Sequence, residues 1–139
     1  EREVTFYTRS DKPHTEGNSY YKEYNYWDIP QLVQESKVTL QKLDNIFEEG
    51  AVFDLIKIDT QGSELDILEG GKDIVSRTSI IILEVSFIEH NIGSPTAEQT
   101  LDYMKDIGFT KKMSIGEHYD ENKLVQEDIV FVREKVYDK

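Results

Sequence analysis

The sequence predicts an α/β domain with a mainly parallel sheet that ends in an antiparallel hairpin. Two nearly continuous apolar runs, residues 52–59 and 79–87, are typical of buried parallel strands. Each run is followed by apolar residues at helical spacing, which gives the alternation of strands and helices found in α/β proteins. Two further strands are predicted at residues 109–115 and 128–133. Their connection, residues 116–126, is too short for a crossover helix, so this pair is antiparallel.

Composition excludes several classes of protein. The chain has 139 residues, which indicates one domain, and it carries 16 Lys and Arg against 28 Asp and Glu, a net charge of −12. Such an acidic chain is a poor ligand for nucleic acid or for an anionic membrane surface. The absence of cysteine excludes disulfides and zinc–thiolate sites, and no apolar run approaches the roughly 20 residues that span a bilayer. Because no targeting segment is present, we expect a cytoplasmic protein.

The first third of the chain is predicted to hold one strand, a loop and one helix. Residues 4–8 are β-branched and aromatic and indicate a strand. Residues 10–37 are polar and rich in tyrosine, which predicts a long surface loop with one helical turn at residues 30–34. A helix is predicted over residues 42–49, ending at Gly50. The apolar residues at helical spacing in it are Leu43, Ile46 and Phe47.

Two helices are predicted between the later strands. Ser63 and Asp66 have the spacing of a capping box, so the first of these helices begins there, and Gly70-Gly71 interrupts it. Its buried stripe comprises Leu65, Leu68, Ile74 and Val75. Ser94-Pro95 predicts the start of the second helix, with Pro at its first position, and Gly108 its end. The core face of this second helix comprises Leu101, Met104 and Ile107.

Several common catalytic motifs are absent from the sequence. None of the eight glycines has the G-x-G spacing of a dinucleotide-binding loop, and there is no G-x-S-x-G nucleophile elbow. The histidines, His14, His90 and His118, lie far apart in the sequence and form no H-E-x-x-H zinc motif.

The densest group of chemically active residues is Lys57-x-Asp59-x-Gln61-Gly62-x-Glu64, at the carboxyl end of the first buried strand. Ligands of α/β proteins bind outside this edge of the sheet. Asp59 and Glu64 could orient a substrate hydroxyl, accept its proton, or hold a divalent cation through oxygen. The structural alternative is that Asp59 caps the following helix, Glu64 complements the helix dipole, and Lys57 extends to water.

Two further candidates are a carboxylate and an aromatic group. Glu84 interrupts the second apolar strand, where an unpaired carboxylate is unfavourable. It either faces the same pocket as Asp59 or forms an ion pair with Lys57 across the two strands. The aromatic group is either a stacking platform for a sugar or other flat substrate, or packs the N-terminal loop onto the sheet. Its members are Tyr20, Tyr21, Tyr24, Tyr26 and Trp27.

Three stretches of the sequence carry a resemblance to one known family. Residues 38–46 (VTLQKLDNI) are similar to a "tLDdl" segment, with Lys42 in place of the usual Thr. Residues 54–70 (DLIKIDTQGSELDILEG) are similar to the longer signature "IKiDvqGaE…vL.Ga", and residues 80–86 (IIILEVS) to an "iilEvs" strand. In this order they resemble the FkbM family of S-adenosylmethionine-dependent methyltransferases, and the resemblance covers nearly the whole chain.

The resemblance implies a Rossmann-like class I methyltransferase sheet, of which this chain holds a part. The family's domain begins with a glycine-rich strand–turn–helix and a second strand whose terminal acid holds the cofactor ribose. This sequence contains no Asp-x-Gly-x-x-x-Gly stretch. We therefore expect residues 1–139 to be the C-terminal part of such a domain, inactive alone. Residues 1–50 would supply the N-terminal strand, loop and helix, and residues 51–139 the α/β core.

The resemblance also implies an activity and roles for individual residues. S-adenosylmethionine would be the cofactor, and the methyl acceptor a hydroxyl on a small molecule or saccharide. Asp59 would orient or deprotonate this hydroxyl, directly or through a divalent metal held with Glu64. Glu84 would be a further supporting carboxylate, and Lys57 would lower the pKa of these carboxylates. The residues implied to contact the cofactor are Gln61 and Gly62.

Two other functions are compatible with the same residues. A non-catalytic α/β module could form a homodimer through the edge of the strand at residues 52–59, because an unpaired strand edge is a template for pairing. Alternatively, a divalent metal held by Asp59, Glu64 and Glu84 could serve hydrolysis.

Overall fold

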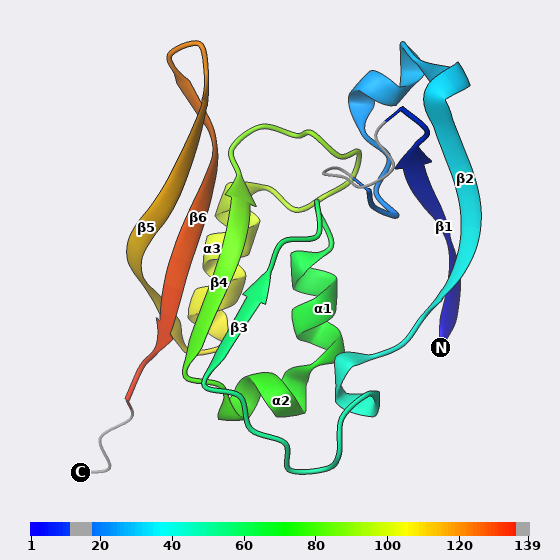
Figure 1. Ribbon diagram of the computed structural model, residues 1–139. Helices are drawn as coiled ribbons and strands as arrows, with labels where there is room; N and C mark the ends of the chain where they lie inside the picture. The colour runs from blue at the N-terminus through cyan, green and yellow to red at the C-terminus, as the bar shows by residue number, and fades with distance from the viewer. Residues whose placement is uncertain (12–17, 136–139) are drawn as a thin grey trace.

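The computed structural model describes residues 1–11 and 18–135 as a mixed α/β fold (Figure 1). These residues form a four-stranded sheet with α-helices and a separate two-stranded sheet. In chain order the elements are β1 (Arg2–Arg9), η1 (Tyr24–Trp27), η2 (Pro30–Leu32), β2 (Val33–Leu40), η3 (Leu43–Asn45), β3 (Leu55–Ile58), α1 (Glu64–Gly70), α2 (Lys72–Arg77), β4 (Ile80–Ser86), α3 (Ala97–Asp106), β5 (Phe109–Asp120) and β6 (Lys123–Arg133).

The four-stranded sheet has the order β3-β4-β6-β5 and mixed pairing. Strands β3 and β4 are parallel, whereas β6 is antiparallel to both β4 and β5. The α/β class and the closing antiparallel hairpin are therefore confirmed. The expectation of a mainly parallel sheet is wrong for the described residues, because β6 inserts between β4 and β5 and makes two antiparallel pairings against one parallel pairing.

The strands differ in length from the apolar runs that predict them. β3 is shorter than residues 52–59 and lies at an edge of the described sheet, where Val52 is 62% exposed and Leu55 48% exposed. β5 and β6 are longer than residues 109–115 and 128–133 and continue almost to the tip of their hairpin. Their polar outer halves pair through the backbone, which an apolar pattern does not report.

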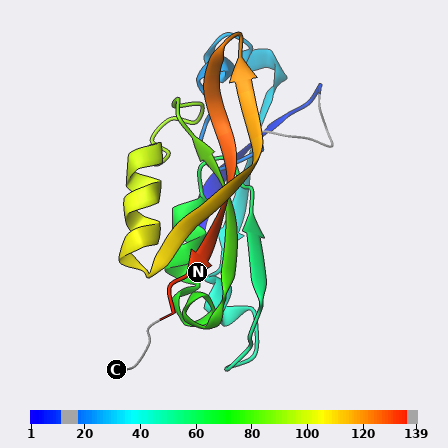
Figure 2. The ribbon, with the colours of Figure 1, turned by 90° about the vertical axis from the view of Figure 1, so that its left-hand side faces the viewer.

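The core lies between one face of the sheet and the helices. In β4 the burial alternates, with Ile81, Leu83 and Val85 fully buried and the residues between them only partly buried. Figure 2 shows α2 and α3 on the same side of the sheet. Met104 of α3 and Leu68 of α1 pack into this core as the helical spacing predicts. The buried core residues are Ile58, Leu68, Val75, Ile81, Leu83, Val85, Met104, Phe109, Ile129 and Phe131.

The N-terminal part forms a two-stranded antiparallel sheet beside α1 (Figure 1). The strand predicted at residues 4–8 is confirmed as β1, and the turn expected near Pro30 is confirmed as η2. The prediction of a loop over residues 10–37 is partly wrong, because residues 33–37 belong to β2. Residues 12–17 of the predicted loop lie outside the described residues. β2 is rich in charged and polar residues, and its extended conformation comes from pairing with β1 along its full length.

The helix predicted over residues 42–49 is wrong. Only the short turn η3 forms there, because two of the three apolar residues that predict the helix are not buried against the core: Ile46 is 58% exposed and Phe47 42% exposed. Phe47 instead meets Phe53 edge to face, with 5.0 Å between ring centroids. A helix of this length is stable in a protein only when one face is buried.

The start of α3 also differs from the prediction. Thr96, rather than Ser94-Pro95, caps the helix: its Oγ1 accepts a hydrogen bond from the N–H of Gln99 (3.1 Å), and the Gln99 side chain accepts from the N–H of Thr96 (2.9 Å). This reciprocal pair is a capping box. The Ser94 hydroxyl instead donates to the carbonyl of Asn91 (2.8 Å) and holds the preceding loop. Among the described residues, no helix is long and apolar enough to cross a membrane.

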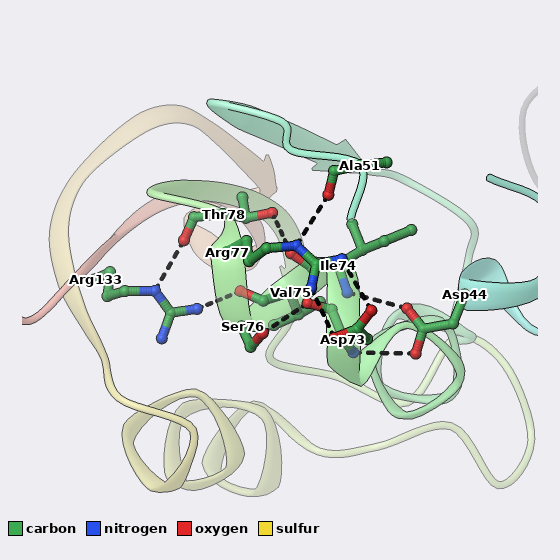
Figure 3. A network of polar contacts seen from close by, with 9 residues as sticks. All are labelled: Asp44, Ala51, Asp73, Ile74, Val75, Ser76, Arg77, Thr78 and Arg133. Atoms are coloured by element: carbon green, nitrogen blue, oxygen red, sulfur yellow. Dashed lines mark hydrogen bonds and ion pairs between the residues drawn. The ribbon is translucent and has the colours of Figure 1, made fainter. Parts of the chain in front are cut away.

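Side chains from distant parts of the chain hold both ends of α2 (Figure 3). Asp44 accepts hydrogen bonds from the N–H groups of Asp73 and Ile74, each at 3.0 Å. The adjacent Gly71 has no side chain that could cap the helix, so Asp44 takes this role. At the other end, the Arg133 guanidinium donates to the carbonyls of Thr78 (2.9 Å) and Val75. A carboxylate at the N-terminus and a cation at the C-terminus both suit the helix dipole.

Asp44→Ala is expected to lower the free energy of unfolding by about 1–2 kcal/mol, because α2 loses the acceptor for two N–H groups. Urea unfolding followed by circular dichroism measures the change. Asp102→Ala, at an exposed position on α3, is the control and is expected to stay within about 0.5 kcal/mol of the parent chain. Equal stability of the two variants would show that Asp44 does not cap α2.

Candidate functional site

One buried carboxylate closes the turn between β3 and α1. Glu64 is the first residue of α1 and is 7% exposed. Its Oε1 accepts a hydrogen bond from the N–H of Thr60 (3.0 Å), and its two oxygens accept from the N–H of Gly62 (3.2 and 3.0 Å). The predicted capping box of Ser63 and Asp66 is wrong: Ser63 makes no cap hydrogen bond, and its hydroxyl donates back to the carbonyl of Thr60 (3.4 Å).

This closure places two consecutive residues in the left-handed region of the backbone map. Gln61 has φ 55° and Gly62 has φ 107°. A left-handed conformation is uncommon for a residue with a side chain, and residues that adopt it cluster at functional sites. The Gln61 carbonyl accepts a hydrogen bond from the hydroxyl of Ser19 (2.9 Å), a buried residue that follows β1. The turn is therefore held both by α1 and by the N-terminal part of the chain.

The Gln61 side chain connects the turn to Glu84 on the neighbouring strand. Its Nε2 donates to Oε1 of Glu84 (3.0 Å) and lies 3.5 Å from Oδ1 of Asp59. From the other side, Nε2 of Gln126 on β6 donates to the same Oε1 of Glu84 (2.9 Å) and to the hydroxyl of Ser86 (3.3 Å). Glu84 is therefore held between two amide groups at the carboxyl end of β4.

The pKa of the Glu84 carboxyl is raised from 4.5 to about 7, first because burial disfavours its charged form. The negative charges of Asp59, Asp128 and Glu64 raise the pKa further, while the hydrogen bond from Gln61 lowers it. A carboxyl group with a pKa near neutral pH can exchange a proton with a substrate, and such groups are common in active sites.

The structure decides between the alternatives for Asp59 and Lys57. Asp59 does not cap α1, since Glu64 occupies the turn; its side chain is 44% exposed. Lys57, 51% exposed, pairs with Asp59 at 3.9 Å, and within the described residues it forms no ion pair with Glu84. The cross-strand pair is therefore wrong, and Asp59 and Glu84 approach the same point through Gln61.

A small polar pocket opens at this point, between the β3–α1 turn, β4 and the start of α3. Its wall includes the site residues Gly62, Glu64 and Glu84 predicted from the sequence, whereas Lys57, Asp59 and Gln61 lie outside it. The residues lining the pocket are Gly62, Glu64, Glu84, Ser86, Asn91, Ser94, Pro95 and Thr100. Hydroxyl and carboxylate oxygens dominate, so the pocket suits a group that donates hydrogen bonds.

Part of the aromatic group holds the N-terminal loop in place, but against α1 rather than onto the sheet as the packing alternative has it. The hydroxyls of Tyr20 and Tyr21 both donate to Oδ2 of Asp66 on α1, at 2.5 and 2.7 Å. Burial and this bond raise the pKa of Tyr21 to about 12, so it stays protonated. Tyr24 is 48% exposed and donates to Glu89 (3.1 Å). The side chains of Tyr26 and Trp27, and His14, lie outside the described residues.

Sequence reasoning missed Gln126 and Asn91. Gln126 falls in the predicted connection, residues 116–126, and only the register of β4 with β6, which places it opposite Ser86, brings it to Glu84. Asn91 is 3% exposed and donates to the carbonyl of Tyr21 (2.8 Å), tying the pocket loop to the N-terminal segment. No local pattern marks either residue, because their partners are distant in the chain.

The described residues contain no group of three or more His, Cys, Asp or Glu side chains placed to hold a metal ion. Both oxygens of Glu64, one of the suggested ligands, already accept N–H groups of the turn. The geometry therefore gives no support to metal-assisted hydrolysis at Asp59, Glu64 and Glu84.

A mixed α/β domain with a polar pocket at the carboxyl ends of parallel strands is the architecture of α/β ligand-binding and group-transfer proteins. The profile of the Methyltransferase FkbM domain matches residues 2–111, which is most of the chain. The chain therefore belongs to the FkbM methyltransferase family, and the resemblance carried by its three sequence stretches is confirmed.

Curated relatives match the chain over a shorter region. It is 29% identical over 76 residues to one component of eukaryotic translation initiation factor 3 from Botryotinia fuckeliana, and equally to the same component from Sclerotinia sclerotiorum. The match covers 53% of this chain but spans only 12% of the length of either relative. No solved structure matches the chain significantly.

Gly62→Val is expected to lower the free energy of unfolding by about 2 kcal/mol or more, since the residue would be strained and would also clash. A Cβ at Gly62 would lie 2.8 Å from Cβ of Ser94. Gly50→Val is the matched control, because Gly50 has a similarly positive φ of 83° but nothing within 4 Å of a Cβ. Thermal and urea unfolding compare the two. An equal loss in both variants would show that the close approach of Ser94 adds no cost beyond the backbone strain at a positive φ.

The raised pKa of Glu84 predicts how stability depends on pH. The folded chain binds the Glu84 proton more tightly than the unfolded chain, so the stability that this proton contributes is lost as pH rises from 4.5 to about 7. Because Glu84 is partly exposed, the loss is on the order of 1 kcal/mol. Unfolding of the parent chain and Glu84→Gln at several pH values measures it: the difference should grow in favour of Glu84→Gln across this window. A difference independent of pH would contradict the raised pKa.

Proposed function

We propose that the chain forms the acceptor side of an S-adenosylmethionine-dependent O-methyltransferase acting on a hydroxyl of a small molecule or saccharide. The strongest support is the environment of Glu84. Its carboxyl has a pKa of about 7 and lines a pocket of hydrogen-bond acceptors, in a chain that belongs to the FkbM methyltransferase family. Methylation of a hydroxyl requires a group that takes the hydroxyl proton near neutral pH.

The charge at the site suits the cofactor. S-adenosylmethionine, when bound, supplies a methyl group on a sulfonium cation, and the electron pair of the carbon–sulfur bond leaves with sulfur. Asp59, Glu64, Glu84 and Asp128 concentrate negative charge near the end of β4, an environment that stabilises a cation. The chain has no Asp-x-Gly-x-x-x-Gly stretch that would bind the rest of the cofactor. We therefore assign to this chain only contacts near the sulfonium group, made by these carboxylates and by the Gln61–Gly62 turn.

The chain's own residues divide the remaining work. Glu84 accepts the proton of the acceptor hydroxyl, while Asp59, exposed beside it, orients the hydroxyl. Lys57 pairs with Asp59 and balances the charge of that carboxylate. The Gln61 amide lies between Asp59 and Glu84, and the backbone N–H of Gly62 holds the turn by donating to Glu64.

Asp59→Ala is expected to lower methyl transfer on the order of 100-fold or more while leaving the free energy of unfolding nearly unchanged, because Asp59 is exposed and does not cap a helix. The assay follows labelled methyl from S-adenosylmethionine into a panel of saccharides, small alcohols and small amines, with and without Mg²⁺, using the intact protein that carries this chain. Asp102→Ala is the control.

Three outcomes would contradict this proposal. Unfolding of Asp59→Ala would make Asp59 a structural residue. Unchanged transfer by Asp59→Ala would exclude its role at the acceptor. Transfer to nitrogen acceptors alone would overturn the assignment of a hydroxyl acceptor.

A second candidate function follows from the edge of the sheet. β3 has no strand on its outer side among the described residues, and Leu55 on it is 48% exposed. An unpaired edge of this kind can pair with a second copy of the chain in a non-catalytic assembly. Sedimentation equilibrium and a calorimetric titration with S-adenosylmethionine together distinguish the two: a tight dimer that binds no S-adenosylmethionine would favour the assembly function.

A further inference from the structure

The two amides that hold Glu84 both donate to the same carboxylate oxygen. Nε2 of Gln61 lies 3.0 Å and Nε2 of Gln126 lies 2.9 Å from Oε1. Within residues 1–11 and 18–135, Oε2 of Glu84 accepts no hydrogen bond. The two oxygens of this carboxylate are therefore not equivalent.

Each amide is oriented by a second contact. The Gln126 amide also donates to the Ser86 hydroxyl (3.3 Å), two residues beyond Glu84 on the same strand. The Gln61 amide also approaches Asp59 (3.5 Å), and its backbone is held in the left-handed region at φ 55°. An amide nitrogen can only donate, so in these orientations neither group can accept a proton from Glu84.

This asymmetry determines where a proton can reside. When a carboxylate becomes a neutral acid, one oxygen carries hydrogen and must face an acceptor or solvent. Oε1 faces two N–H donors, so a proton on Oε1 would face their hydrogen atoms and would have no acceptor. Oε2 is the oxygen that can take up and release a proton, on a side chain that lines the polar pocket with Ser86 and Asn91.

We propose that Gln61 and Gln126 are positioning residues that hold Glu84 by Oε1 and present Oε2 as the proton-accepting atom to the substrate hydroxyl. The proton passes from the hydroxyl to Oε2, and the hydroxyl oxygen keeps the electron pair that forms its new bond. The identity of the hydroxyl as a methyl acceptor rests on the proposed function. The arrangement of the two amides does not.

Other charges around Glu84 act in the opposite direction from the amides. Asp59 at the end of β3, Glu64 on α1 and Asp128 on β6 raise the pKa of Glu84, and Lys57 lies 3.9 Å from Asp59. The Gln126 amide donates to Glu84 and Ser86 and is hydrogen-bonded to none of these four groups within the described residues. A change in the titration of Glu84 in a Gln126 variant therefore reports the loss of the amide itself.

The test is a carbon-13 NMR titration of the Glu84 carboxyl in the parent chain and in Gln126→Met, which removes the amide but retains similar volume. Loss of one hydrogen bond to the charged form is expected to raise the pKa of Glu84 by about 1. Gln34→Met, at an exposed position on β2, is the control and should leave the titration unchanged.

Gln61→Gly is a second variant that protects the test against misfolding, because glycine adopts a φ of 55° without strain. It should raise the pKa of Glu84 in the same way. Glu121→Gly is its matched control: Glu121 also has a positive φ, 53°, in the hairpin tip, so the substitution relieves strain without touching the amides. An unchanged Glu84 titration in both folded glutamine variants would overturn the positioning role.

The titration and the methyl-transfer assay fail independently. The titration needs neither cofactor nor acceptor, so an upward shift in a protein that transfers no methyl would remove the proposed function alone. If methyl transfer occurs, its dependence on pH should move upward in Gln126→Met along with the titration. Transfer whose pH profile is the same in both proteins would overturn the role of Oε2.

Discussion

The carboxylate of Glu64 accepts the N–H groups of Thr60 and Gly62, and the geometry of the candidate site depends on this closure. Because the turn is short and is closed by a buried carboxylate, Gln61 lies in a left-handed conformation. That conformation directs the Gln61 amide to Glu84 on the neighbouring strand. The sequence alone suggests Glu64 as a catalytic group, but in the structure it is first a structural residue that fixes the turn and so positions other groups.

Other parts of the fold also contact this turn and the residues around it. The N-terminal segment reaches the turn through Ser19 and reaches the pocket loop through the Tyr21 carbonyl. β6 supplies Gln126 because it lies between β4 and β5. Segments far apart in the chain therefore meet at the carboxyl end of β4. In a chain of the FkbM methyltransferase family, this edge of the sheet is where a ligand is expected to bind.

Sequence patterns predict the buried part of this structure well and its polar part poorly. The apolar run at residues 79–87 and the helical spacing at Met104 report burial directly: the strand forms as β4, and both β4 and Met104 contribute to the core. Polar strands such as β2 form through pairing with a distant partner, so no local pattern reveals them. The candidate residues Asp59, Glu64 and Glu84 could be found from the sequence. The sequence does not show that Glu64 is the structural residue and Glu84 the candidate proton acceptor, because these roles depend on hydrogen bonds between residues on different elements.

The most direct test of this account is a crystal structure of Glu64→Met, in which the side chain fills a similar volume but accepts no hydrogen bond. The account predicts that Gln61 leaves the left-handed region and that its Nε2 no longer lies within hydrogen-bond distance of Oε1 of Glu84. A structure in which Gln61 keeps a φ near 55° and still donates to Glu84 would contradict the account. The turn would then be set by its own sequence or by Ser19, and not by the carboxylate.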